Sequence, residues 1–182
     1  MPERPPTALN LASGAEIRPL DDGDIALLRT LHRSGENATL AAALNIDEPG
    51  VIGALQAEPW CNPMVLLQEE QPVGAALIAP ADTQHLNGRL VVLAGEPRRC
   101  TDALALYIRH AFWSHPIHRL YAIAPRGYTS HLELLRGCGF VDEGRLLGHL
   151  RVGARMQDLD VLGLLREDFD RWCAQYAPDW LL

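Results

Sequence analysis

Metal-binding and disulfide patterns are missing from this sequence. Only four of the 182 residues are cysteines, and no two of them form the Cys-x-x-Cys pair that is typical of zinc sites. The spacing therefore predicts no metal site. It favours four buried or half-buried thiols in a reducing compartment.

Positive charge and long apolar runs are also scarce. The 16 Lys and Arg residues are outnumbered by 23 Asp and Glu residues, which gives a formal net charge of -7. This balance argues against general nucleic-acid binding, although a local basic patch over a phosphate remains possible. No apolar run approaches the roughly 18 residues of a membrane span. The first six residues contain three prolines, unlike a signal peptide. We expect a cytoplasmic protein without membrane association.

The length and the 48% hydrophobic content predict one globular domain. We expect residues 1–14 to be a flexible N-terminal tail and residues 15–170 to be the domain. Residues 171–182 carry Trp172, Tyr176 and Trp180. This aromatic segment is expected to pack on the domain or to form a dimer contact, so both a monomer and a homodimer remain open.

Periodicity and turn residues predict an alternation of strands and helices. Asp21, Asp22 and Asp24 offer caps for a first helix, and Ser130 and Glu133 have the spacing of a capping box. Strands are expected at 16–20, 64–68, 73–79, 89–94, 119–124, 140–151 and 154–162, and helices near 25–31, at 39–44, from Pro49, from Thr101, from Ser130 and at 166–176. The fold class is therefore a mixed α/β domain, with a central sheet of about six or seven strands flanked by helices.

Three segments carry a resemblance to a known family. Gly139–Arg145 reads Gly-Phe-Val-Asp-Glu-Gly-Arg and resembles the GF-x-x-EG segment of the GCN5-related N-acetyltransferase (GNAT) superfamily. Asp158–Glu167 resembles the D-x-x-x-x-x-L-L-x-E ending of the branch that acetylates ribosomal-protein N-termini, and Glu16–Asp24 resembles its opening. The resemblance covers about residues 15–170.

The resemblance implies an acyl-CoA co-substrate, such as acetyl-CoA, bound between two splayed parallel strands. Those strands would be Arg89–Ala94 and Arg119–Ala124. The pantetheine would pair with the backbone of Val92, Leu93 and Ala94. The pyrophosphate would lie at the start of the following helix, where free N–H groups attract an anion. The acceptor would be an amine-bearing small molecule or a protein N-terminus.

The family's pyrophosphate loop, R/Q-x-x-G-x-G/A, is degenerate here. Arg98 stands where a glycine is expected, Glu96 adds a negative charge, and Pro97 lacks an N–H. One interpretation is that Arg98 and Arg99 replace backbone contacts to the phosphates with charge-assisted ones. Cys100 and Thr101 are the other two candidate cofactor-binding residues of this turn. The alternative is a solvated basic turn on a protein that no longer binds CoA.

Catalytic candidates follow from the same resemblance. The position of the usual acid tyrosine is Leu135, which cannot donate a proton. Ser130 could replace it or serve only as a helix cap. His85 lies near the position where relatives place a base, and His131 is a second candidate base.

The function expected from the sequence is N-acyl transfer from acyl-CoA to a primary amine, and the acidic charge balance would suit a cationic acceptor. Two alternatives remain open. One is a catalytically degenerate binding or regulatory module with this fold. The other is an acyltransferase whose donor is an acyl group on a carrier protein, which would need no pyrophosphate loop.

Overall fold

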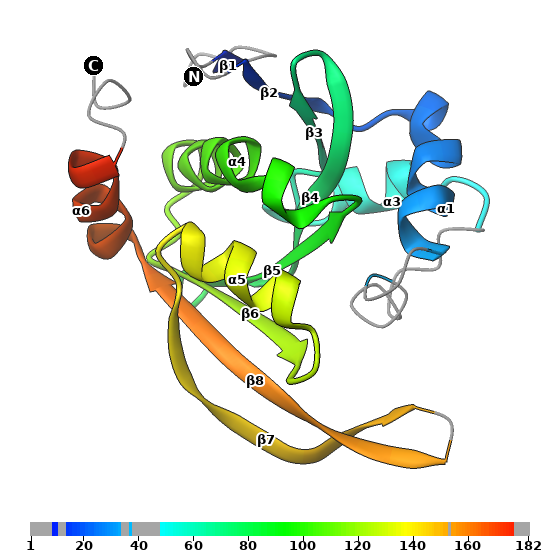
Figure 1. Cartoon of the computed structure of the whole chain (residues 1–182). Coiled ribbons are helices and arrows are strands. Elements are labelled where there is room, and N and C mark those ends of the chain that lie inside the picture. Colours follow the sequence, from blue (N-terminus) through cyan, green and yellow to red (C-terminus); the bar gives the residue numbers. More distant parts are fainter. Residues whose placement is uncertain (1–8, 11–13, 34–36, 38–47, 153, 177–182) are drawn as a thin grey trace.

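The computed structural model describes residues 9–10, 14–33, 37, 48–152 and 154–176 (Figure 1). The described strands are β1 (Leu9–Asn10), β2 (Ala15–Pro19), β3 (Met64–Gln68), β4 (Gln71–Asp82), β5 (Asn87–Ala94), β6 (Arg119–Pro125), β7 (Val141–Val152) and β8 (Arg155–Leu165). The described helices are α1 (Ile25–Arg33), α3 (Val51–Ala57), α4 (Thr101–Ser114), α5 (Thr129–Gly137) and α6 (Arg166–Tyr176), with short 3-10 turns η1 (Asp22–Asp24) and η2 (Pro97–Arg99).

The described strands form one sheet in the order β1-β2-β3-β4-β5-β6-β8-β7. Neighbours run antiparallel except β5 and β6, which run parallel. The prediction of a mixed α/β domain is confirmed. The sheet has eight strands rather than six or seven, because Leu9–Asn10, in the segment expected to be a tail, pairs with β2.

Helices cover both faces of the sheet. The larger core lies under α4, α5 and α6, and the smaller one lies under α1 and α3 (Figure 1). The run Ala103–Ile108 of α4 is buried without interruption, so this helix has almost no solvent face over that stretch. Its apolar composition follows from that position, since a helix with neighbours on every side needs no polar stripe.

The turn before α1 is fixed by carboxylates, as the sequence predicts. The Asp21 side chain accepts a hydrogen bond from the Gly23 N–H at 2.7 Å, and the Asp24 carboxylate accepts one from the Asp21 N–H at 3.0 Å. Arg18 donates two further bonds to Asp24, of 2.6 and 2.7 Å. These bonds from Arg18 lower the pKa of the buried Asp24 carboxyl and offset the cost of burying its charge.

Two expected helix starts are wrong. The helix α5 begins at Thr129 after Tyr128, no side chain caps it, and Ser130 lies exposed inside the first turn. Pro49 is not the first helical residue, because α3 begins at Val51 after Gly50, whose φ of 78° is left-handed. The helix expected at 39–44 lies outside the described residues.

The last helix is attached to the domain by a ladder of aromatic rings. Phe169 lies 5.8 Å from Phe112 and 5.6 Å from Trp172, centroid to centroid, and Trp172 lies 5.7 Å from Tyr176. Trp172 also lies against Gly139, where a Cβ would come within 3.2 Å of the indole ring. Because Gly139 also has a φ of 92°, a glycine is required here for two reasons. Trp180 lies outside the described residues.

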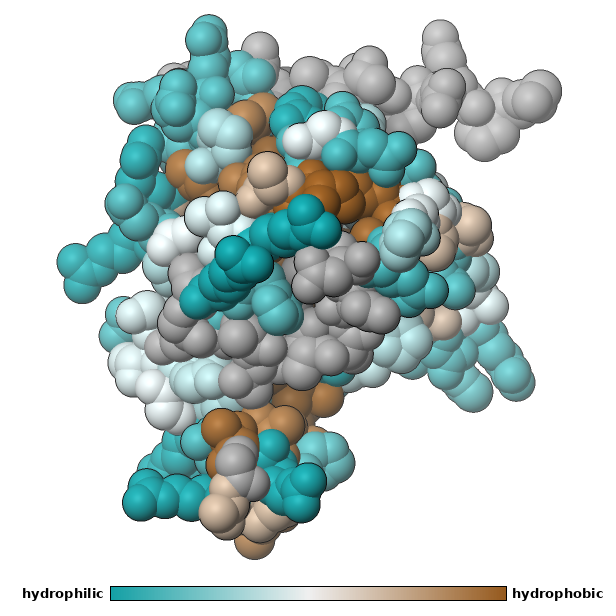
Figure 2. Space-filling model, turned by 90° about the vertical axis from the view of Figure 1, so that its right-hand side faces the viewer, coloured by the Kyte–Doolittle hydropathy of each residue, from teal (hydrophilic) through white to brown (hydrophobic). Residues whose placement is uncertain are grey.

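The strands β7 and β8 extend past the body of the molecule as a long hairpin (Figure 1). The register between these strands shifts between Leu146 and Leu150, and such a bulge interrupts the regular edge that β7 presents at the end of the sheet. Apolar side chains lie on the surface of this hairpin (Figure 2), where Leu147 is 78% exposed and Met156 is 58% exposed.

Replacing Gly74 with alanine is expected to destabilise the sheet next to β5. A Cβ at this position would lie 2.6 Å from the Leu93 carbonyl oxygen and 3.3 Å from the Cys100 sulfur. Backbone on the neighbouring strand would have to move, so we expect Gly74→Ala to lower the free energy of unfolding by about 2 kcal/mol. Urea denaturation measures the change. Gly53→Ala is the control, because nothing lies within 4 Å of a Cβ there.

Candidate functional site

The two parallel strands separate partway along their length. Their pairing covers only Asn87–Arg89 of β5 and Arg119–Tyr121 of β6. Beyond Arg89 the strand β5 continues to Ala94, and β6 continues to Pro125 without a ladder between them. This leaves a wedge between β5 and β6, defined here as the space that starts at the Arg89–Tyr121 pair and widens toward Ala94.

The wedge exposes the backbone edge of β5 at alternate residues. The Gly95 N–H donates to the Val73 carbonyl of the preceding strand at 2.9 Å, and the β4–β5 register places Gly74 opposite Ala94. By the alternation of an antiparallel ladder, the N–H and C=O groups of Val92 and Ala94 therefore point toward β6 and into the wedge. These are the backbone groups that the sequence nominates for pantetheine, together with Leu93.

At Ala94 this edge is already engaged by a side chain. The buried Asn37 side-chain amide donates to the Ala94 carbonyl at 2.8 Å and accepts from the Ala94 N–H at 3.2 Å. The same amide donates to the Leu31 carbonyl at 2.9 Å. Asn37 thus pairs with Ala94 as a peptide group of a neighbouring strand would. At Val92, where β6 has diverged, no ladder partner remains on that side.

Two unpaired cations stand where β5 turns into α4. Arg98 and Arg99 lie exposed in η2, and within the described part of the chain their side chains form no hydrogen bond or ion pair. Thr101 opens the fourteen-residue helix α4, and no side chain caps it. Free N–H groups, the helix dipole and two guanidinium groups together favour an anion at this point.

Cys100 serves the fold of this turn rather than a ligand. Its thiol is fully buried and donates to the Val73 carbonyl at 3.1 Å. Burial raises the pKa of the thiol to about 12, so no thiolate forms at neutral pH. Of the four expected contacts in the turn, Arg98, Arg99 and Thr101 are accessible and Cys100 is not.

At the narrow end of the wedge, an open part of the sheet carries a group of polar side chains that the sequence did not single out. On β6, Arg119, Tyr121 and Ile123 are half-exposed, whereas the alternating Leu120, Ala122 and Ala124 are buried under α4 and α5. The Arg119 guanidinium lies 5.3 Å from the Tyr121 ring centroid and forms an ion pair with Glu143 of β7. Arg89 lies beside Tyr121, at the end of the parallel ladder.

Solved structures resemble the fold of this chain, although its sequence matches no family model and no curated protein. The spermidine N-acetyltransferase of Vibrio cholerae in complex with CoA and spermine superposes with a TM-score of 0.70 at 17% identity, over 86% of this chain and 98% of that chain. A probable acetyltransferase superposes with a TM-score of 0.71 at 18% identity, over 88% and 98%. The fold is that of the GCN5-related N-acetyltransferases. At these identities the likeness establishes the fold alone.

Within this acetyltransferase fold, the candidate base His85 lies in the exposed turn between β4 and β5. Its Nδ1 lies 2.9 Å from the Asp82 carboxylate. The backbone N–H of His85, and then this side-chain contact, lower the pKa of the Asp82 carboxyl. The Nε2 atom is left for proton transfer. His85 precedes the Arg89–Tyr121 pair by four residues, at the end of β5 opposite to Ala94.

The other two catalytic candidates lie in the first turn of α5. The Ser130 side chain is exposed, while His131 is only 3% exposed. Burial lowers the pKa of His131 to about 4, so the imidazole is neutral at pH 7 and a weak base. The structure therefore places Ser130 and His131 on one helix turn and His85 at a separate end of β5.

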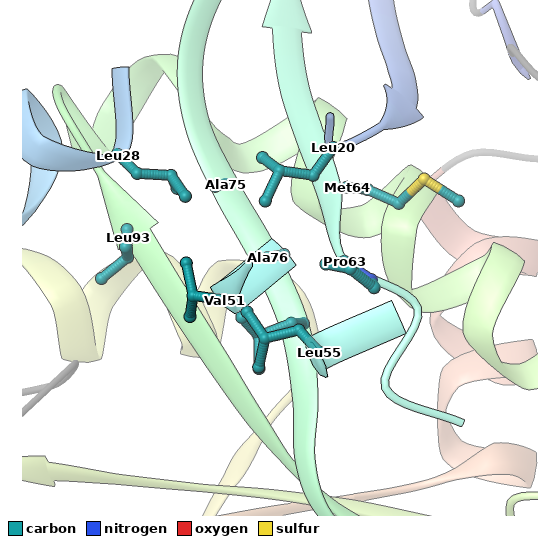
Figure 3. Close-up of a pocket in the computed structure, with 10 residues that line it drawn as sticks. Leu20, Leu28, Val51, Leu55, Pro63, Met64, Ala75, Ala76 and Leu93 are labelled. Carbon is teal, nitrogen blue, oxygen red and sulfur yellow. The ribbon is translucent and has the colours of Figure 1, made fainter. Parts of the chain in front are cut away.

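An apolar pocket lies under α1 and α3, on the same face of β5 as Leu93 (Figure 3). Its walls are entirely apolar, and Figure 3 shows that α1, α3, β4 and β5 all contribute side chains, among them Leu28, Val51, Leu55 and Leu93. The cavity volume is about 20 Å³, which is room for one water-sized group. It is too small to hold an acyl chain or an acceptor.

The described residues include no cluster of three or more His, Cys, Asp or Glu side chains that could hold a metal ion. No described helix is both long and apolar enough to cross a bilayer. All four cysteines are buried and free, as the sequence predicts.

Proposed function

We propose that the protein transfers an acetyl or other short acyl group from acyl-CoA to a primary amine. The observation that carries the proposal is the wedge between β5 and β6, which starts at Arg89–Tyr121 and opens toward the two unpaired arginines of η2. The spermidine N-acetyltransferase with the same fold was solved with CoA and spermine, which supports an acyl-CoA donor and an amine acceptor. A cytoplasmic location belongs to this proposal, since acyl-CoA is an intracellular metabolite.

The residues fit an acyl-CoA in part. Arg98 and Arg99 would hold the pyrophosphate together with the N–H groups at the start of α4. The Val92 edge would pair with the pantetheine, whereas Ala94 could do so only after losing its bonds to Asn37. Pro97 supplies no N–H, and the Gly95 N–H already donates to the Val73 carbonyl at 2.9 Å. Side-chain charge would therefore replace the backbone cradle.

In the transfer step, the amine lone pair attacks the thioester carbonyl carbon. A C–N bond forms, the C–S bond breaks, and CoA leaves as a thiolate. The Val92 N–H would donate to the oxyanion, which leaves the Val92 carbonyl to pair with the pantetheine. The amine must first lose a proton, and His85 is the better acceptor of the two histidines because His131 is held neutral with a pKa of about 4. The attacking nitrogen still carries a surplus proton, and transfer of that proton through Ser130 or water to the thiolate would complete the amide and release CoA as the thiol.

Acetyl-CoA is expected to stabilise the protein against heat and to release free thiol when an amine is added. At 100 times its dissociation constant, the ligand should add about 2.7 kcal/mol to stability. The double variant Arg98→Glu/Arg99→Glu should lose this stabilisation, because two attractive charges near the pyrophosphate become repulsive. Thermal melting and a thiol-reactive dye measure the two effects.

The matched control changes the same charge elsewhere. Arg151 and Arg155 are exposed at the far end of the β7–β8 hairpin, so Arg151→Glu/Arg155→Glu should keep the response to acetyl-CoA. An unchanged melting temperature of the wild type at millimolar acetyl-CoA would rule the proposal out. Equal losses in both double variants would show that net charge, rather than this turn, governs binding.

A second candidate function has a specific observation in its favour. The bonds from Asn37 to Ala94 occupy part of the β5 edge, as would suit a binding or regulatory module that has lost CoA. Such a module predicts neither stabilisation by acetyl-CoA nor thiol release, whereas stabilisation without thiol release would favour a CoA-binding regulator. If the donor is instead an acyl group on a carrier protein, we expect turnover with the acylated carrier protein and no response to acetyl-CoA.

A further inference from the structure

A row of residues crosses the sheet at the level where β5 and β6 stop pairing. Arg89 stands opposite Tyr121, Tyr121 stands opposite Gly163 of β8, and Gly163 stands opposite Val141 of β7. Neighbouring strands lie roughly 4.8 Å apart, so the row spans about 10 Å from Arg89 to Gly163. It lies directly at the narrow end of the wedge, where the acyl group of a bound donor would be.

The part of the row over β6 and β8 is internally neutral. The Arg119 guanidinium forms an ion pair with Glu143 while also lying over the Tyr121 ring. Glu143 reaches across Gly163, and a Cβ at Gly163 would overlap its carboxylate. The missing side chain at Gly163 thus makes room for this ion pair, and neither charge is left over for a ligand.

Arg89 is different, because its charge has no partner. The residue is half-buried, and its Nε is buried without a hydrogen-bond partner. Within the described part of the chain, the Arg89 side chain forms no hydrogen bond or ion pair. Leu90, Val92 and Ala94 belong to the core under α4. Alternation along the strand therefore places Arg89 on the opposite, open face together with Tyr121.

A half-buried guanidinium without an anion is costly, because it loses water contacts and gains nothing in exchange. Its planar fork of N–H donors matches a carboxylate in geometry as well as in charge. An anionic group bound here would lie beside Tyr121 and in front of the free Val92 edge. The remaining charges on this face, Arg119 and Glu143, already neutralise each other.

We propose that Arg89 binds a carboxylate of the acceptor, so that the substrate is an amine that also carries a carboxylate, as an α-amino acid does. This inference rests on the proposed acyl transfer. With the carboxylate on Arg89, the amine is held at the start of the wedge and faces the thioester. A polyamine would instead bring positive charge to an unpaired cation. The overall acidic charge of the chain therefore does not set the acceptor, since the local charge at the row is positive.

The carboxylate could come from a free amino acid or from an acidic first residue of a peptide. Thiol release is therefore measured with acetyl-CoA and four acceptor classes: free amino acids, the corresponding amino acid amides, peptides beginning with Asp or Glu, and spermine. We expect turnover with a carboxylate-bearing class and a value of kcat/KM at least about tenfold higher than for the amides. The comparison between free amino acids and acidic peptides identifies the source.

Arg89→Met is the decisive variant. It removes an unpaired charge from a half-buried position, so we expect it to fold with unchanged or higher stability. The preference for the carboxylate-bearing acceptors over the amides should disappear, while stabilisation by acetyl-CoA should remain. Arg89→Lys keeps the charge without the fork and should retain part of the preference. Arg155→Met, at the distant hairpin, should change nothing.

The outcomes distinguish a failure of the carboxylate proposal from a failure of the acyltransferase proposal. If acetyl-CoA stabilises the protein and thiol is released equally from amides and amino acids, the carboxylate proposal is wrong and acyl transfer stands. A preference that survives Arg89→Met also overturns it. If no acceptor class releases thiol and acetyl-CoA does not stabilise the protein, the acyltransferase proposal itself fails.

Discussion

Lowering the pH from 6.5 to about 4 is expected to remove about 3 kcal/mol from the free energy of unfolding through His131. This side chain is 3% exposed in the first turn of α5. Burial favours its neutral form and lowers its pKa from 6.5 to about 4.

The sign of the effect follows from proton binding in the two states. In the unfolded chain, His131 takes up a proton near pH 6.5, while in the folded protein it does so only near pH 4. Between these values the unfolded state binds more protons, so stability falls as the pH falls. Above pH 6.5 the imidazole is neutral in both states and the contribution is complete.

Two further histidines act in the same direction. Burial lowers the pKa of His110 and of His115, and both lie at the C-terminal end of α4. The carboxylates behave differently. The pKa of Asp24 is lowered by Arg18, so its contribution is present above its unfolded value and is lost only as the pH falls through the lowered pKa. The histidines therefore dominate the range above pH 4.

Urea denaturation at closely spaced pH values tests this expectation. The variant His131→Leu, of similar size, should flatten the profile between pH 6.5 and 4 by about 3 kcal/mol relative to the wild type. Ser130→Ala, at the exposed neighbouring position, is the control and should leave the profile unchanged because it removes no titratable group. Parallel profiles for wild type and His131→Leu would show that His131 is not held neutral by burial.

Local sequence signals predicted the scaffold better than they predicted the site. The apolar run at Arg89–Ala94 and the helix from Thr101 are where the pattern places them, because each is governed by neighbours in sequence. The capping box at Ser130 fails for a related reason. The spacing of Ser130 and Glu133 does not by itself fix the helix start, and α5 begins one residue earlier, at Thr129, so Ser130 lies inside the first turn and cannot cap the helix.

The polar groups at the wedge depend on contacts that no local pattern contains. Asn37 reaches Ala94 across 57 positions in the sequence. The Arg89–Tyr121–Gly163 row exists only because two registers coincide at the place where one ladder ends. One signal was present in the sequence, namely a lone arginine near the start of an otherwise apolar strand, since a charge in such a position needs a reason.

Asn37→Leu is expected to destabilise the ligand-free protein and to strengthen acetyl-CoA binding. The substitution removes one bond to the Leu31 carbonyl and leaves both polar groups of Ala94 without this partner. Unpaired buried groups of this kind cost about 3 kcal/mol together. The same substitution frees the β5 edge, so pantetheine no longer has to displace a side-chain amide. We expect the dissociation constant for acetyl-CoA to fall by about tenfold.

The measurements are urea denaturation without ligand and calorimetric titration with acetyl-CoA. Gln56→Leu is the matched control, because Gln56 also donates from a side-chain amide to a backbone carbonyl, that of Leu20, at 2.8 Å and outside the wedge. It should lower stability without changing the affinity. If Asn37→Leu leaves the affinity unchanged, then Ala94 is not a contact of the pantetheine and Val92 alone provides the edge. If the affinity falls, the Asn37 amide is itself part of the binding surface, and its bonds to Ala94 shape the wedge for the ligand rather than competing with it.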